Sequence, residues 1–99
     1  MADTEKDFQA RVVEFATLMG WKVYHTYDSR RSSPGFPDLI LVQGRSMFCL
    51  ELKSEKGKVS NAQLEWVAAL DDVRHCEAGV YRPGDEEDIR KALKKRGKW

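Results

Sequence analysis

The sequence predicts an α/β domain in which a mixed central sheet is flanked by helices. With 99 residues, 41% of them hydrophobic and 33% charged, the chain has the size and composition of one globular domain, taken to span residues 1–99. Helical and strand patterns follow one another in the order α-β-β-β-α-β-α. Short links join the first three strands, which favours an antiparallel meander. A helix before the last strand returns the chain as a parallel neighbour.

The first expected helix covers residues from about Thr4 to Met19. Apolar residues recur along it at spacings of three and four: Phe8, Val12, Phe15 and Met19. Thr4 or Asp3 can cap its first turn, and Gly20 can end it as a left-handed glycine.

Three strands are expected next, over residues 21–27, 38–42 and 47–53. The first is rich in aromatic and β-branched residues, and the other two are short apolar runs. A loop of Ser, Arg, Gly and Pro separates the first two strands, and a hairpin-type turn containing Gly44 joins the second to the third.

The second half of the chain begins with a polar loop and a helix over Ser60–Leu70. Ser60 and Gln63 have the spacing of a capping box. A last strand is expected over residues 77–82, and Asp85 can cap the final helix.

Composition also limits the cellular setting and the partners. The net charge is only +1, so a nucleic acid would have to be held by local patches. Cys49 and Cys76 form no CxxC pair, so neither a disulfide framework nor a zinc pattern is indicated. No signal peptide or membrane-spanning run is found. We therefore expect a soluble, cytoplasmic protein with reduced thiols and no membrane partner.

Charged residues stand at the ends of two apolar strands. Asp38 opens one strand, while Glu51 and Lys53 project from the same face of the next, because side chains alternate in a strand. If these strands pair through a turn at Gly44, residue 38 falls opposite residues near 51. Two carboxylates and one ammonium would then meet at the end of the sheet.

Such a cluster suits a hard divalent cation. Mg²⁺ prefers a few carboxylate oxygens, activates water as a nucleophile and neutralises charge on a phosphate. Lys53 could orient or help deprotonate the water and stabilise the phosphate. Asp38, Glu51 and Lys53 therefore have a coherent role in phosphodiester hydrolysis.

The spacing Pro37-Asp38 … Glu51-Leu52-Lys53 resembles the PD-(D/E)XK nuclease motif, and the order of elements is similar to that superfamily's restriction-endonuclease-like αβββαβ core. The stretches "GFPDLILV", "ELKSEKGKVS" and "NAQLEWV" resemble the short stand-alone form of the VRR-NUC family, from Glu5 to about Leu93. This resemblance implies an endodeoxyribonuclease that uses Mg²⁺ or Mn²⁺. Stand-alone members resemble Holliday-junction resolvases, which implies branched DNA such as junctions or flaps, and a homodimer that cuts two strands together.

The resemblance also implies roles for individual residues. Asp38 and Glu51 would be metal ligands, the backbone carbonyl of Leu52 a further ligand, and Lys53 the catalytic lysine. Gln63 matches a family glutamine on the helix after the lysine strand, which would make it part of the catalytic set.

Two of these assignments keep an alternative. Gln63 also completes a capping box, and both interpretations stay open. The family's first-helix glutamate could be Glu5 or Glu14. At 100° per residue, Glu5 lies within the apolar arc of the helix and Glu14 on nearly the opposite face, so we favour Glu5.

Further polar residues are candidate DNA contacts: His25, Ser29, Arg30, Arg31, Ser33, Lys56 and Lys58. The alternative for the serine and arginine loop is an ordinary solvated segment. For His25, packing or a phosphate contact is favoured over a role as general base. The basic tail, from Arg90 onward, could add a phosphate-binding patch or be a solvated helix face.

Two other functions compete with a nuclease. One is a non-catalytic nucleic-acid-binding module on the same fold, and the other is an ion-paired cluster that holds no metal. The complete set of Asp38, Glu51 and Lys53 argues against the first, because a decayed site usually loses one of the three.

Overall fold

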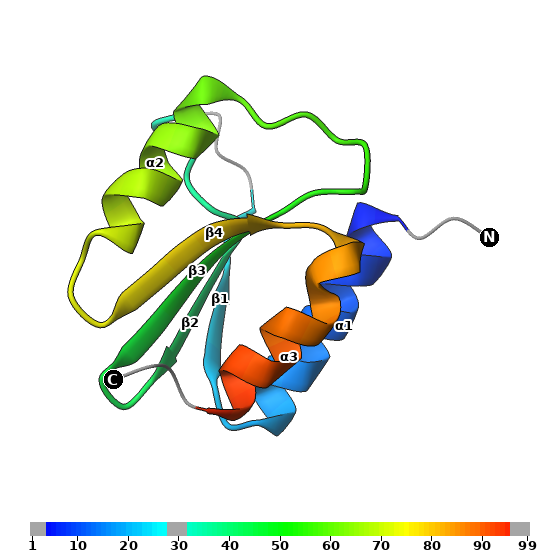
Figure 1. Cartoon of the computed structure of the whole chain (residues 1–99), viewed down its shortest axis with the longest axis vertical. Coiled ribbons are helices and arrows are strands. Elements are labelled where there is room, and N and C mark those ends of the chain that lie inside the picture. Colours follow the sequence, from blue (N-terminus) through cyan, green and yellow to red (C-terminus); the bar gives the residue numbers. More distant parts are fainter. Residues whose placement is uncertain (1–3, 28–31, 96–99) are drawn as a thin grey trace.

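The computed structural model describes residues 4–27 and 32–95. Their elements are α1 (Glu5–Leu18), β1 (Lys22–His25), β2 (Leu39–Gln43), β3 (Ser46–Leu52), α2 (Asn61–Asp71), β4 (Cys76–Tyr81), the 3-10 turn η1 (Pro83–Asp85) and α3 (Glu86–Lys94). The four strands form one sheet in the order β1-β2-β3-β4. Figure 1 shows α1 and α3 on one face of this sheet and α2 on the other. The expected order of elements is confirmed, and only η1 is added.

The pairing of the strands also agrees with the sequence. β1 with β2 and β2 with β3 are antiparallel, whereas β3 with β4 is parallel across the α2 crossover. Gln43 pairs with Ser46, so the hairpin turns through two residues. Gly44 takes φ 59° at the first of them, as a type II′ turn requires. Because Leu39 pairs with Leu50, the same register brings Asp38 alongside Glu51.

Helix α1 is fixed at both ends by its own sequence. The Thr4 hydroxyl accepts from the Asp7 N–H at 3.0 Å, and the Asp7 carboxylate accepts from the Thr4 N–H at 3.4 Å. At the other end, Gly20 has φ 89°, and the Trp21 N–H reaches the Ala16 carbonyl at 2.9 Å. This is a Schellman motif, and it ends the helix where the glycine was expected to end it.

The residues of α1 that are buried in the core differ from the expected ones near the C-terminal end of the helix. Phe8, Val12 and Ala16 are buried, but Met19 is 37% exposed. Met19 is the C-cap residue, and the chain has begun to turn away there. The expectation that Met19 packs in the core was therefore wrong, and Ala16 takes that place.

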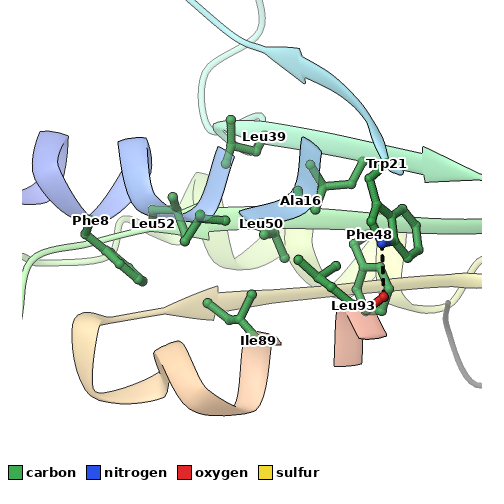
Figure 2. Packing of buried hydrophobic residues seen from close by; sticks show 11 residues of the cluster. Phe8, Ala16, Trp21, Leu39, Phe48, Leu50, Leu52, Ile89 and Leu93 are labelled. Atoms are coloured by element: carbon green, nitrogen blue, oxygen red, sulfur yellow. Dashed lines mark hydrogen bonds between the residues drawn. The ribbon is translucent and has the colours of Figure 1, made fainter. Parts of the chain in front are cut away.

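The core lies between the sheet and the pair α1 and α3 (Figure 2). The Trp21 ring meets Phe48 edge-on at 5.2 Å, and its Nε1–H donates to the Leu93 carbonyl at 3.1 Å. The cluster consists of Phe8, Val12, Ala16, Trp21, Leu39, Leu41, Phe48, Leu50, Leu52, Ile89 and Leu93. Phe48, Leu50 and Leu52 all belong to β3, so the intervening side chains of that strand must face α2.

Two cysteines lie on the face of the sheet that α2 covers. Cys49 and Cys76 are free and buried, with their Sγ atoms 3.6 Å apart. Burial raises the pKa of Cys49 to about 12 and raises the pKa of Cys76 as well. Both therefore stay protonated at neutral pH and serve as small packing residues. Among the described residues, no helix is both long and apolar enough to cross a membrane.

The segment before β2 is docked on the start of α2. Gly35 has φ 92°, and a Cβ added there would lie 2.5 Å from the Ala62 carbonyl carbon. The rings of Phe36 and Trp66 meet edge-on at 5.1 Å. Only a glycine allows this close approach of two backbones, and the approach sets the direction in which the chain enters Asp38.

We predict that Gly35→Ala destabilises the protein by roughly 2–4 kcal/mol, because an unfavourable φ and a clash with backbone act together. Gly44→Ala is the matched control, since Gly44 also has positive φ but sits in an exposed hairpin turn. Urea unfolding of both variants measures the difference. Equal losses in the two variants would show that the contact with Ala62 is unimportant.

An ion pair links α1 to α3. The Arg11 guanidinium donates from Nε and Nη2 to Glu86, with the shortest distance 2.9 Å, and Arg90 adds a contact at 3.2 Å. The hydrogen bond from Arg11 is the main cause that lowers the pKa of Glu86 below its usual value of 4.5. A lowered pKa in the folded state means that stability is gained above the usual pKa and lost as the pH falls.

Glu86→Gln should therefore reduce the free energy of unfolding at pH 7 by about 0.5–1 kcal/mol, a modest value because the pair is partly exposed and screened. The difference from wild type should shrink as the pH falls from 7 to about 3, because the stabilisation is lost as the carboxyl becomes protonated in the folded state. Urea titrations at the two pH values measure it. Glu87→Gln, on the exposed side of α3, is the control. A penalty that persists at low pH would rule out an ionic origin.

Candidate active site

One end of the sheet gathers four of the predicted site residues. β2 begins and β3 ends there, and α2 starts nearby. The Asp38 carboxylate accepts from the Leu52 N–H at 2.9 Å. The Gln63 amide donates to Glu51 Oε2 at 2.9 Å, and Lys53 Nζ lies 3.7 Å from the same oxygen. Asp38, Glu51, Lys53 and Gln63 thus form one connected cluster.

Asp38 is held by the strands on both sides of it. Its carbonyl accepts from the Thr26 N–H at 2.8 Å, and the preceding Pro37 carbonyl accepts from the Thr26 hydroxyl at 2.9 Å. Its carboxylate reaches in the other direction, to the backbone of Leu52. Asp38 is therefore more than a turn residue after a proline, because its side chain ties β2 to the end of β3.

Glu51 is the most unusual group of the cluster. It is only 2% exposed, and while Oε2 contacts Gln63 and Lys53, Oε1 is buried with no hydrogen-bond partner. Burial raises the pKa of the Glu51 carboxyl to about 7, and the charge of Asp38 adds to the rise, whereas Lys53 opposes it. Glu51 therefore lacks a positive partner sufficient to keep it charged at its ordinary pKa.

Asp38 and Glu51 are neighbouring carboxyl groups, and the charge of Asp38 raises the pKa of Glu51. Two negative charges at such a position repel each other unless a proton or a cation accompanies them. The pair is therefore a candidate site for a cation.

Gln63 combines the two roles left open by the sequence. Its Oε1 accepts from the Ser60 N–H at 2.9 Å, and its own N–H donates to the Ser60 hydroxyl at 3.1 Å, which completes the capping box. The cap occupies the oxygen of the side-chain amide, so the NH₂ end is free to donate to Glu51. The helix cap and the contact to the cluster therefore depend on one side chain.

Lys53 and Leu52 are fixed by the neighbouring strand. The Lys53 N–H donates to the Tyr81 carbonyl at 2.9 Å, one residue beyond the end of β3. The Lys53 side chain is 16% exposed, so its ammonium lies at the edge of the cluster. Leu52 meets Asp38 through its N–H, and a ligand role for its carbonyl stays a prediction.

Of the two first-helix acids, only Glu5 has a charge that affects the pKa of Glu51. It adds to the rise in the pKa of Glu51, and Glu14 is not among the charges that do so. Both side chains are exposed. Glu5 stands near the cluster without a direct bond to it, and its role as the first-helix acid stays a prediction.

The candidate DNA contacts that lie within the described residues are not part of this cluster. His25 Nε2 lies 3.0 Å from the Gln9 amide, and its ring packs 4.3 Å from that of Tyr27, which agrees with a packing role. Ser33 and the lysines Lys56 and Lys58 are exposed. Ser29, Arg30 and Arg31 lie outside the described residues, as does the tail beyond residue 95.

The basic residues of α3 divide into two groups. Arg90 contacts Glu86 and lies over the Phe15 ring at 4.6 Å, so it is committed to packing between the helices. Lys91, Lys94 and Lys95 are exposed. The helix face was expected to be either solvated or phosphate-binding, and Arg90 fits neither.

The oxygen donors of the cluster fit a hard divalent cation. Within residues 4–27 and 32–95, no group of three or more His, Cys, Asp or Glu side chains is placed to hold a metal. The pair formed by Asp38 and Glu51 offers two carboxylates, and one Glu51 oxygen is buried without a partner. Mg²⁺ is held in this way in proteins, by one or two carboxylates with water in the remaining positions.

Of the further contacts that the structure shows, the one from Gln9 to His25 could have been found from the helix period, and the others could not. Gln9 lies one helical turn after Glu5, so the helix period would have placed it on the same face. Arg82 and Glu55 meet only through the fold, and no periodicity links them. The bonds from Thr26 to Pro37 and Asp38 follow from the β1–β2 pairing.

Comparison with known proteins identifies the family. The VRR-NUC domain model matches residues 4–82. A solved structure described as a VRR_NUC domain protein aligns with a TM-score of 0.74 at 19% identity, over 98% of this chain and 93% of that one. Another, described as a VRR_NUC domain, aligns with a TM-score of 0.59 at 22% identity, over 92% of this chain and 96% of that one. No curated protein sequence matches. The shared fold and the family match show that this chain belongs to the VRR-NUC family of nuclease-type domains.

Proposed function

We propose that this protein is a Mg²⁺- or Mn²⁺-dependent endonuclease that hydrolyses phosphodiester bonds in DNA. The observation that carries the proposal is the buried carboxylate of Glu51, which is 2% exposed, lies next to Asp38 and has one oxygen without a partner. Burying such a pair is costly unless positive charge accompanies it. Membership of a nuclease family is consistent with that charge being a catalytic metal.

Asp38 and Glu51 would hold the ion, with the Leu52 carbonyl as a third protein ligand. When bound, the ion acts as a Lewis acid at the scissile phosphate and makes water more acidic. The protein contributes the orientation of the ligands. The Leu52 N–H fixes the Asp38 carboxylate and the Gln63 amide fixes Glu51, so the ligands are held before DNA arrives.

Lys53 would act on the phosphate. Its ammonium lies 3.7 Å from Glu51 Oε2, at the partly exposed edge of the cluster. From there it can stabilise the negative charge that develops on the phosphate oxygens and orient the attacking water. Glu5, whose charge affects Glu51, would add a further carboxylate near the ion.

DNA would reach this end of the sheet through polar segments on both sides. Ser33, Lys56 and Lys58 are exposed, and Ser29, Arg30 and Arg31 stand close to Ser33 in the sequence. Contacts of this kind hold the phosphate backbone without reading sequence. Each chain carries one cluster, so an intracellular homodimer would cut both strands of a branched DNA such as a junction or a flap.

We predict Mg²⁺- or Mn²⁺-dependent cleavage of at least one DNA from a panel of four-way junctions, flaps, linear duplexes and single strands, abolished by EDTA. Lys53→Ala should lower kcat at least 100-fold with DNA affinity within about threefold, because the lysine acts mainly on the charge of the transition state. Lys22→Ala, exposed and at the opposite end of β1 from His25, is the control and should keep full activity.

Cleavage that survives EDTA or the loss of Lys53 would contradict this mechanism. Binding of DNA without cleavage under every metal would instead favour the non-catalytic binding module.

Metal binding can be tested without DNA. Mg²⁺ should raise the thermal unfolding midpoint of wild type, since a ligand at 100 times its Kd stabilises the folded state by about 2.7 kcal/mol. Asp38→Asn and Glu51→Gln should lose this response, because each removes one charged ligand. Glu65→Gln, on the exposed side of α2, should keep it. An equal response in all four proteins would place metal binding elsewhere and favour an ion-paired cluster that holds no metal.

A further inference from the structure

The link between β3 and α2 leaves the candidate active site directly. It runs from Lys53 to Ser60 and carries two more lysines, Lys56 and Lys58. Figure 1 shows this link in green, arching beyond the end of the sheet at which β4 leads into α3. Its own backbone supplies one turn, in which the Gly57 N–H donates to the Ser54 carbonyl at 3.2 Å. A polar link of this length needs further contacts to hold one conformation.

Arg82 supplies two of these contacts. Its Nη1 donates to the Ser54 carbonyl at 2.6 Å and to the Glu55 carbonyl at 3.1 Å. These are the two residues that follow Lys53. Arg82 stands directly after β4, and its own N–H is held by the Asp85 carboxylate at 2.8 Å. The guanidinium is therefore presented from a fixed backbone.

Glu55 returns a bond to the same segment. Its Oε2 accepts from the Gly84 N–H at 2.8 Å. A Cβ on Gly84 would come within 3.3 Å of that oxygen, so the close approach is favoured by a glycine. Residues 54–55 and 82–84 are thus joined by three hydrogen bonds that involve charged side chains, a type stronger than the bond between neutral groups.

These bonds act next to Lys53. On one side, the Lys53 N–H is bonded to the Tyr81 carbonyl at 2.9 Å. On the other side, the carbonyls of residues 54 and 55 are bonded to Arg82. The backbone N–H of Lys53 and the carbonyls of the two residues after it are therefore bonded to consecutive residues, Tyr81 and Arg82. These bonds fix the backbone from which the Lys53 side chain extends to Glu51.

We propose that Arg82 is a positioning residue of the active site, which together with Glu55 and Gly84 holds the link after β3 so that Lys53 stays aligned with Glu51. The inference rests on the proposed nuclease function. The role rests on Nη1, which donates to two carbonyls, and requires no contact of Arg82 with DNA. Its loss should therefore affect turnover and the order of the link more than DNA binding.

The test compares Arg82→Gln, Arg82→Lys and Glu55→Gln with wild type in the full chain. Arg45→Gln is the matched control, since Arg45 is exposed in the hairpin at the opposite end of β3. Steady-state cleavage gives kcat and KM, and amide hydrogen exchange reports the order of residues 54–58. Arg82→Gln should lower kcat at least tenfold, change KM less than threefold and speed exchange of the Gly57 amide at least tenfold.

Arg82→Lys should recover part of kcat, because an ammonium can still donate to one carbonyl. Glu55→Gln should show a smaller loss of kcat with faster exchange in the same segment. It also keeps the inference testable if Arg82→Gln does not fold, since Glu55 is exposed. Wild-type kcat in Glu55→Gln, with exchange unchanged, would then overturn the inference.

Three further results would overturn the inference. Wild-type kcat and exchange in Arg82→Gln would show that the bonds position nothing. A raised KM with unchanged kcat would make Arg82 a DNA contact instead. A wild-type protein that cleaves no DNA under any metal would remove the proposed function and this inference together, whereas full activity in both wild type and Arg82→Gln removes the inference alone.

Discussion

The alternation of side chains along β3 is the constraint on which the site depends. β3 pairs with β2 on one side and β4 on the other, so its position in the sheet is fixed. Because Phe48, Leu50 and Leu52 fill the core beneath α1 and α3, Glu51 must point to the opposite face and is buried near the start of α2. A carboxylate in that position needs partners. The capping glutamine and Lys53 contact one of its oxygens, and the other is buried without a hydrogen-bond partner.

The same residues thus support both the fold and the candidate site. Gln63 starts α2 and orients Glu51 through the two ends of one amide. Asp38 satisfies the Leu52 N–H at the end of β3 and stands beside Glu51 as its electrostatic neighbour. Gly35 lets the preceding loop pack on Ala62, so the segment that leads into Asp38 is fixed against the helix that carries Gln63. Such preorganisation is what a metal site requires of its surrounding residues.

Much of this arrangement could be predicted from the sequence, and the rest could not, for a physical reason. A strand period of two and a glycine in the hairpin were enough to bring Asp38 beside Glu51, and the helix period separated Glu5 from Glu14. Both are local rules. The burial of Ala16 in place of Met19 depends on where the helix ends against the sheet. The contacts of Arg82 with Ser54 and Glu55 join segments that only the fold brings together. No periodicity encodes such a contact.

The central claim is that Asp38 and Glu51 together bind a divalent cation. Anomalous X-ray diffraction from crystals grown with excess Mn²⁺ locates such an ion directly, because manganese scatters anomalously and the protein hardly does at a suitable wavelength. We expect one strong peak in contact with both carboxylates, including the Glu51 oxygen that is buried without a partner, and no peak there in Glu51→Gln crystals. Manganese bound only elsewhere, or an empty position between the two carboxylates at saturating Mn²⁺, would contradict the claim.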